Sequence, residues 1–217
     1  MEWLANVPAT VVITVCVVLL VWYFVGAQWN RRQSRRFVRG LAKGFAGLNP
    51  PPKIQWLGTS AFQILASSPP EPFKWLGIMV VLEPREMLLL WIFNRARGRR
   101  DLLVVKGEFE KEPRREVELF DLTTPTGREG SRSATAERWL VAEAAGGADL
   151  RWAYPAGQPD PRPRWAGIVE GLPFRLHRMS IRSSSPHLLL SLSPTSEEFP
   201  GDRLLTGLQA IAAEAVR

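Results

Sequence analysis

Cysteine and histidine are scarce in this chain of 217 residues. It has one cysteine, Cys16, and two histidines, His177 and His187. A single cysteine excludes an internal disulfide, so a secreted domain stapled by disulfides is not supported and a reducing compartment is compatible. A set of three or four zinc ligands cannot be assembled from these side chains. We therefore expect no metal ion.

Sequence motifs for catalysis and for phosphate binding are also missing. Neither histidine is accompanied by a Gly-x-Ser-x-Gly elbow, and the glycines from Gly40 to Gly47 follow no strand and precede no Gly-Lys-Ser/Thr. His177 lies among arginines, where a solvated or hydrogen-bonded histidine is commoner than a catalytic base. The mixed charges between Glu108 and Glu118 are typical of a solvated surface rather than a metal site. We therefore name no catalytic residue and expect no cofactor.

Charge is absent from a long stretch near the N-terminus, between Trp3 and Asn30. The densest part, residues 9–27, contains 19 residues, of which eleven are Val, Ile, Leu or Phe. As a helix it would measure ~28 Å at ~1.5 Å per residue, enough to cross a bilayer. The eleven side chains favour insertion by about 3–7 kcal/mol. The sequence predicts a transmembrane helix over 9–27, preceded by a short extracytoplasmic segment, 1–8.

Aromatic side chains flank this predicted helix at both ends. The predicted interfacial aromatics are Trp3 on one flank and Trp22, Tyr23 and Trp29 on the other. A cleaved secretory signal remains an alternative, with Val25-Gly26-Ala27 as its cleavage site. Against it stand the length of the apolar run and the lack of any preceding Lys or Arg. A helix buried in a soluble core is a second alternative, although such cores rarely leave so long an uncharged stretch at a terminus.

Positive charge is concentrated directly behind the predicted helix. Residues 1–70 contain seven basic side chains and one acidic, whereas residues 71–217 contain 21 basic and 20 acidic. Most of the net charge of +7 therefore belongs to the first segment. Basic residues beside a membrane helix are retained in the cytoplasm. The sequence thus predicts a single-pass protein of the cell membrane, with its N-terminus outside and its C-terminal domain in the cytoplasm.

A basic juxtamembrane helix and a Pro-rich spacer are predicted over residues 28–52, either continuing the membrane helix or lying along the headgroups. The predicted membrane-surface contacts are Arg31, Arg32, Arg35, Arg36, Arg39 and Lys43. Each gains about 1 kcal/mol near an anionic leaflet, so we expect anionic headgroups as partners. A plain topology signal without lipid specificity remains an alternative. Gly40 and Gly44 have the spacing of a helix-pairing motif, but outside the apolar span.

The remaining residues, 53–217, predict a cytoplasmic α+β domain. Apolar runs indicate six to eight strands in a mainly antiparallel sheet, with two or three packed helices. Residues 138–144 and 149–154 flank two glycines and predict a hairpin. The polar, glycine-containing segment 123–137 predicts a mobile loop. Residues 87–93, which are apolar on all sides, predict a helix buried between layers.

Taken together, these features favour a non-enzymatic, membrane-tethered domain that acts through protein contacts, as an adaptor or accessory subunit of a membrane assembly. The nine tryptophans suit such contacts, since Trp is enriched at interface hot spots. Two other classes remain: a nucleic-acid- or ribosome-docking membrane protein that contacts phosphates through arginines in 31–43 and 95–100, and an enzyme with an unrecognised site. The near-neutral balance of residues 71–217 argues against nucleic acid. We expect the lipid bilayer and one or more proteins as partners.

Overall fold

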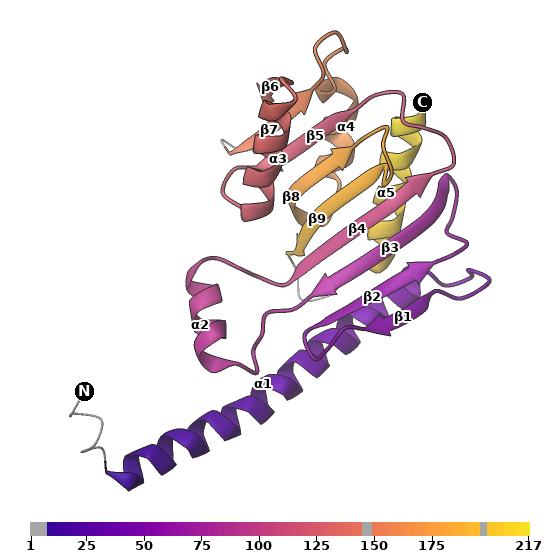
Figure 1. The fold of residues 1–217 in the computed structure, drawn as a ribbon. Helices are drawn as coiled ribbons and strands as arrows, with labels where there is room; N and C mark the ends of the chain where they lie inside the picture. The colour runs from indigo at the N-terminus through magenta and orange to yellow at the C-terminus, as the bar shows by residue number, and fades with distance from the viewer. Residues whose placement is uncertain (1–7, 145–148, 196–198) are drawn as a thin grey trace.

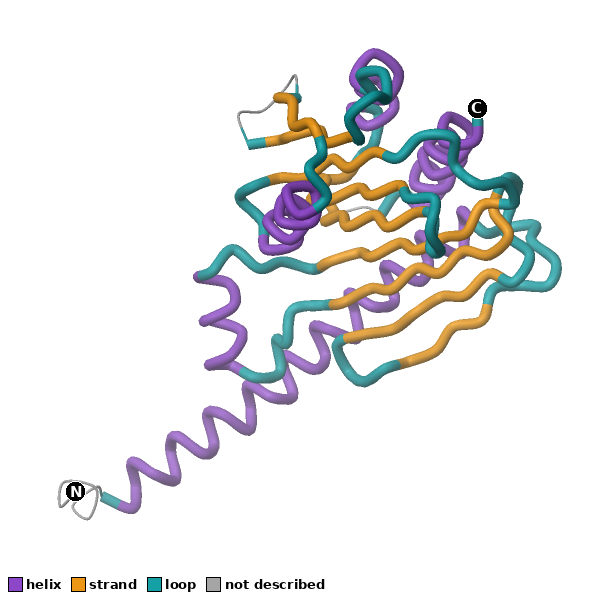
Figure 2. The backbone as a smooth tube through the Cα atoms, turned by 45° about the horizontal axis from the view of Figure 1, so that its top comes forward, coloured by secondary structure: helices purple, strands orange, loops and turns teal. Residues whose placement is uncertain are grey.

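The computed structural model describes residues 8–144, 149–195 and 199–217 (Figures 1 and 2). In this part of the chain, a long helix leads into a domain built on one nine-stranded sheet. The helices are α1 (Ala9–Gly44), α2 (Leu88–Ala96), α3 (Pro125–Ala136), α4 (Arg162–Glu170) and α5 (Gly201–Val216). The strands are β1 (Lys53–Trp56), β2 (Ala61–Ala66), β3 (Phe73–Val81), β4 (Leu102–Phe109), β5 (Val117–Asp121), β6 (Leu140–Glu143), β7 (Leu150–Tyr154), β8 (Phe174–Ile181) and β9 (Leu188–Pro194).

The sheet has the strand order β1-β2-β3-β4-β9-β8-β5-β7-β6, and every neighbouring pair is antiparallel. The predicted α+β class, with an apolar N-terminal helix and a mainly antiparallel sheet, is confirmed. The predicted hairpin is confirmed as the β6–β7 pair, in which Leu140 lies opposite Tyr154. Its connecting residues 145–148 lie outside the described part of the chain. The sheet exceeds the predicted number of strands by one.

The main core lies on one face of the sheet, under the second half of α1, α4 and α5 (Figure 2). Alternate strand side chains such as Ile78 and Leu190 pack there with Leu41 of α1 and Leu208 of α5. The opposite face is covered over β5, β7 and β8 by α3. A smaller cluster around Phe120 forms beneath that helix. Adjacent residues of β5 therefore belong to different cores, as the alternation of side chains along a strand requires.

Most of the segment 123–137 forms the helix α3 (Pro125–Ala136), so the prediction of a mobile loop there is wrong. Thr124 caps the helix by accepting a hydrogen bond from the Gly127 N–H at 3.0 Å, and Pro125 occupies the first turn. Gly127 lies so near the sheet that a Cβ there would come within 1.9 Å of the Asp121 carbonyl oxygen. The small residues that indicated a loop instead allow a close contact between helix and sheet.

Helix α1 is continuous, so the basic segment continues the apolar one, which was the first of the two predicted alternatives. Its last turns approach α5 at backbone distance. A Cβ on Gly201 would come within 2.0 Å of the Gly40 carbonyl oxygen, and one on Gly44 within 2.5 Å of the Gly201 carbonyl oxygen. The pairing motif therefore joins two helices of the same chain. This contact fixes the second half of α1 to the domain, with Phe37 and Leu41 in the core.

Candidate membrane-contact site

The two halves of helix α1 differ in hydropathy and in burial. Its most apolar window of 18 residues has a mean hydropathy of 2.5, and only 6% of that window is buried. Farther along, Asn30, Ser34, Phe37 and Leu41 are buried at the three- to four-residue spacing of a helix docked along one face. Among the described residues, α1 is the one helix long and apolar enough to span a bilayer, which is compatible with membrane anchoring. A signal sequence would have the same length and composition.

A set of contacts that we name the joint connects residues 22–30 of α1 to residues 83–101, the segment containing α2. At one end of the joint, the Trp22 indole Nε1 donates a hydrogen bond to the Arg85 carbonyl oxygen at 2.8 Å. Gly26 lies against the same peptide, where a Cβ would come within 2.2 Å of that oxygen. The two segments thus meet at a distance that a larger side chain at this position would prevent.

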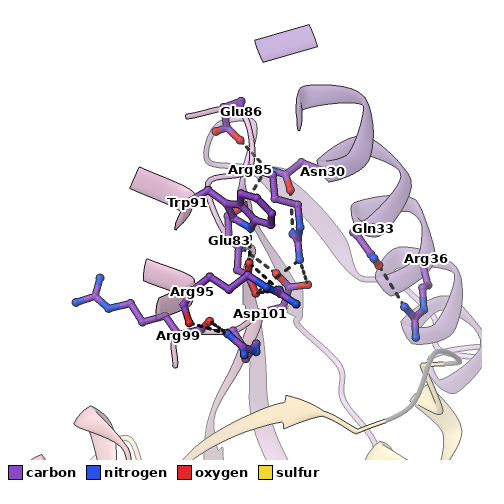
Figure 3. A network of polar contacts seen from close by, with 11 residues as sticks. Asn30, Gln33, Arg36, Glu83, Arg85, Glu86, Trp91, Arg95, Arg99 and Asp101 are labelled. Atoms are coloured by element: carbon purple, nitrogen blue, oxygen red, sulfur yellow. Dashed lines mark hydrogen bonds and ion pairs between the residues drawn. The ribbon is translucent and has the colours of Figure 1, made fainter. Parts of the chain in front are cut away.

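Asn30 lies fully buried at the other end of the joint (Figure 3). Its amide nitrogen donates to the Glu83 carbonyl oxygen at 3.1 Å and to the Glu86 carboxylate at 2.6 Å. Its amide oxygen accepts from the Arg85 guanidinium at 3.0 Å. Because both donors and the acceptor of the side chain are engaged, burial leaves no unpaired amide group. These bonds fix the rotation of α1 relative to the segment before α2.

Arg85 is the buried cation of the joint, and two carboxylates balance it. Its guanidinium lies 3.0 Å from the Asp101 carboxylate and 3.9 Å from that of Glu83. Glu83 also accepts a hydrogen bond from the Trp91 indole at 2.6 Å and pairs with Arg95 at 3.4 Å. Removing one member of a buried ion pair leaves an uncompensated charge at a cost of several kcal/mol. The network therefore favours one arrangement of α1 and α2 over others.

Trp91 of α2 lies close to two tryptophans of α1. The centroid of its ring is 5.5 Å from that of Trp22 and 6.2 Å from that of Trp29. Both belong to the predicted interfacial aromatics, and the structure brings them together at the joint. Tyr23, another of that set, is exposed and makes an edge contact with Phe24 at 5.7 Å between centroids. The fourth, Trp3, lies outside the described residues.

Helix α2 exposes apolar side chains, so the prediction that residues 87–93 form a helix buried between layers is wrong. Leu89 is 74% exposed and Ile92 is 51% exposed. We name the exposed set the α2 face: Met87, Leu89, Leu90, Ile92 and Phe93. The helix lies beside α1, at the end of the domain from which the apolar half of α1 projects (Figure 1). An apolar run predicts a helix, but it does not show whether other parts of the chain cover that helix.

The six predicted membrane-surface cations all lie on α1. Five are exposed, namely Arg31, Arg32, Arg35, Arg39 and Lys43. Arg36 is partly buried and donates a hydrogen bond to the Gln33 side chain at 3.2 Å (Figure 3). At ~1.5 Å per residue, Lys43 lies ~24 Å along the helix from Ala27. Arg31 and Arg32 are therefore nearest to the apolar half, and contact of the six with lipid stays a prediction.

A cavity of about 550 Å³ lies between the C-terminal end of α2 and the N-terminal end of α3. We name it the basic cavity, because Arg97, Arg99, Arg100 and Arg175 line it. Of these four, within the described part of the chain, only Arg175 lies at ion-pair distance from a carboxylate, that of Asp121 at 3.1 Å. Sequence reasoning missed this cavity, because its lining comes from segments far apart in the chain. The arginines between 95 and 100 were the one signal of it.

His177 and Ser193 also line the basic cavity, and their Nε2 and Oγ atoms are 2.8 Å apart. Burial, aided by Arg175, lowers the pKa of His177, which favours a neutral imidazole near pH 7. Burial opposes the charged form of Asp121, but hydrogen bonds from Thr123 and Arg175 outweigh it and lower the pKa of that carboxyl. With an ionised arginine cluster beside a neutral histidine, the cavity is suited electrostatically to an anion.

His187 and Glu118 are held by hydrogen bonds and ion pairs within the fold. His187 accepts a hydrogen bond on Nδ1 from the Phe109 N–H at 3.1 Å. Glu118 is fully buried and pairs with Arg178 at 2.6 Å and Arg182 at 2.7 Å, which fastens the sheet beneath α3.

Across the three described ranges, no three His, Cys, Asp or Glu side chains are grouped to hold a metal ion. No protein-family model matches the chain, and no curated protein matches its sequence.

Proposed function

We propose that the protein is a membrane-anchored adaptor or accessory subunit whose domain is held against the bilayer by α1 and by the α2 face. The observation that carries this proposal is the joint, which buries polar groups while apolar side chains of α1 and α2 stay exposed at one end of the molecule. Large apolar patches of this kind mark interaction or membrane surfaces. With α1 across the bilayer, α2 lies at the boundary between headgroups and acyl chains, as an interfacial amphipathic helix does.

The joint favours a retained helix over a cleaved signal. Cleavage after Ala27 would remove Trp22 and Gly26, and with them the contacts to the Arg85 carbonyl group. It would also remove a ring that lies against Trp91. A signal peptide that is cleaved off does not need to pack against the mature domain at backbone distance.

Charge supports a domain in the cytoplasm and an N-terminus outside the cell membrane. Arg31 and Arg32 follow the apolar half of α1 directly and are exposed. The segment that follows α2 adds Arg97, Arg99 and Arg100 at the same end of the domain. Basic side chains on one flank of a membrane helix resist translocation and are attracted to anionic cytoplasmic lipids.

An edge of the sheet supports a role in protein contacts. Strand β1 is an end strand of the sheet, paired on one side with β2. Ile54 and Trp56 are exposed on this strand, and Leu57 is exposed directly after it. An edge strand offers unpaired backbone groups for strand addition, and an exposed Trp is a frequent hot spot. The partner that fits this edge is an extended segment of a second membrane-associated protein.

The proposed role is tested by the size of the native assembly. The full chain is expressed at its native level, extracted in mild detergent and sized on native gels. We expect an assembly larger than the monomer, which Trp56→Glu disrupts. The matched control Leu140→Glu, on the β6 edge at the other end of the sheet, leaves the assembly intact. A wild-type chain that migrates alone as a monomer would contradict the adaptor role.

A further inference from the structure

We propose that the basic cavity is a binding site for a phosphate group, carried by an anionic lipid headgroup or by a soluble phosphate compound. This inference deepens the proposed function and rests on it, since α2 at the bilayer surface brings the cavity beside the headgroups. Its arginines Arg97, Arg99 and Arg100 follow one another along the C-terminal end of α2 and the loop to β4. Arg175 reaches the same cavity from β8.

The positive charges that line the cavity favour the binding of an anion. Arg99 donates to the Asn94 amide oxygen at 3.3 Å, and Arg100 donates to the Arg99 carbonyl oxygen at 2.8 Å. Because both of these acceptors are neutral, the positive charges of Arg99 and Arg100 stay uncompensated. Glu83 is the lining residue with a carboxylate, and its carboxylate is already engaged by Trp91 and Arg95. Guanidinium groups bind phosphate through paired hydrogen bonds, so a phosphate would relieve the repulsion among these like charges.

The N-terminal end of α3 borders the cavity. Thr126 lines the cavity in the first turn of α3, and its Oγ1 atom is buried without a hydrogen-bond partner among the described residues. Buried polar atoms are almost always paired, so this hydroxyl lacks the partner that such atoms usually have. The positive end of the α3 dipole also lies at this end of the helix, where it favours negative charge.

The volume of the cavity is large enough for a phosphate headgroup with its glycerol. Its volume of about 550 Å³ lies within the usual range for small-molecule sites. Val81, Leu82 and Leu102 supply an apolar part of the lining. The Arg97 guanidinium lies over the Phe93 ring at 3.9 Å, which links the cavity to the α2 face. A lipid whose acyl chains lie along α2 would therefore place its phosphate among the arginines.

The test is a calorimetric titration of the full chain in maltoside micelles, which contain no phosphate. The probes are inorganic phosphate, dihexanoyl phosphatidic acid and, as a neutral control, dihexanoyl glycerol. Binding of phosphatidic acid at least tenfold tighter than phosphate identifies a lipid headgroup. Equal binding of the two identifies a soluble phosphate compound. Binding of neither, or equal binding of the neutral glycerol, overturns the site.

Matched triple variants separate the cavity from general attraction of anions. We expect R97Q/R99Q/R100Q to weaken phosphate binding by about tenfold or more, because charge-assisted hydrogen bonds are lost. The control R31Q/R32Q/R35Q removes the same charge from exposed positions of α1, outside the cavity. It leaves binding within about twofold. Equal losses in both variants overturn the inference.

His177 gives a readout that holds even if a triple variant fails to fold. Because the chain has two histidines, labelled imidazole signals are resolved by NMR in the wild-type protein. A phosphate bound beside His177 raises the pKa of that imidazole and leaves the His187 signal unchanged, since a nearby anion favours the charged form. An unmoved His177 titration at saturating probe overturns the site. Because micelles replace the bilayer here, this failure is distinguishable from a failure of α2 to enter lipid.

Discussion

The sheet core and the joint are built in opposite ways. In the core, strands and helices bury apolar side chains such as Leu103 and Ile211. At the joint, Asn30, Glu83 and Arg85 are buried, and the apolar side chains of α2 face outward. Both arrangements satisfy the same rule, that each surface matches the medium beside it. In the proposed function, this difference marks the end of the molecule that meets the membrane.

Removing the buried cation of the joint should have the largest effect. Arg85→Ala leaves the carboxylates of Glu83 and Asp101 without their buried partner, which we expect to lower the free energy of unfolding by about 3–5 kcal/mol. Denaturant unfolding of the full chain in micelles measures the change. The control Arg203→Ala, at an exposed position of α5, should stay within about 0.5 kcal/mol. A loss below about 1 kcal/mol for Arg85→Ala would show that the joint is not a stabilising network.

The same substitution at two isoleucines compares the sheet core with the α2 face most directly. Ile211 on α5 is fully buried, whereas Ile92 on α2 is 51% exposed. Ile211→Ala should lower the free energy of unfolding by about 2–5 kcal/mol, because it opens a cavity in the core. Ile92→Ala should change it by about 0.5 kcal/mol or less in micelles. Similar losses at the two positions would mean that α2 is as buried as the core.

The close approach at Gly26 predicts a smaller effect. Gly26→Leu forces α1 away from the Arg85 peptide, and we expect overpacking to cost about 1–3 kcal/mol in the same unfolding measurement. Ala42→Leu places the same side chain on an exposed position of α1 and serves as the control. If both substitutions are tolerated equally, residues 22–30 do not form a tight contact with residues 83–101.

A surface ion pair of the sheet should give the smallest effect, and one sensitive to pH. Hydrogen bonds from Lys74, Trp75 and Ser185 lower the pKa of Glu108 to about 2. A folded-state pKa below the ordinary 4.5 means that the stabilisation is present above pH 4.5 and is lost as pH falls toward 2. Glu108→Gln should therefore flatten the decline of the melting temperature between pH 4.5 and 2. An unchanged slope would show that solvent screens this pair completely.

Sequence patterns predicted the helices and strands of this fold better than they predicted the burial and the long-range contacts of those elements. The apolar run of α1 and the β6–β7 hairpin follow from local periodicity, which a single segment carries. The prediction that residues 87–93 are buried was wrong, because the run of Leu, Ile and Phe does not show whether other parts of the chain cover it. The loop over 123–137 was wrong, because Gly127 serves a close contact with β5 that only the folded sheet reveals. The joint and the basic cavity join residues far apart in the sequence, so local patterns did not predict them, and the arginines between 95 and 100 were the one signal of the cavity.

Spin labelling in lipid nanodiscs tests most directly whether the α2 face lies in the bilayer. In a Cys16→Ser background, labels are placed through Leu89→Cys on α2 and Leu140→Cys on β6, which is 49% exposed at the far edge of the sheet. We expect the label at 89 to collide with oxygen more than with a water-soluble nickel complex, and the label at 140 to do the reverse. A label at 89 that meets nickel as readily as the label at 140 would contradict the membrane contact of α2.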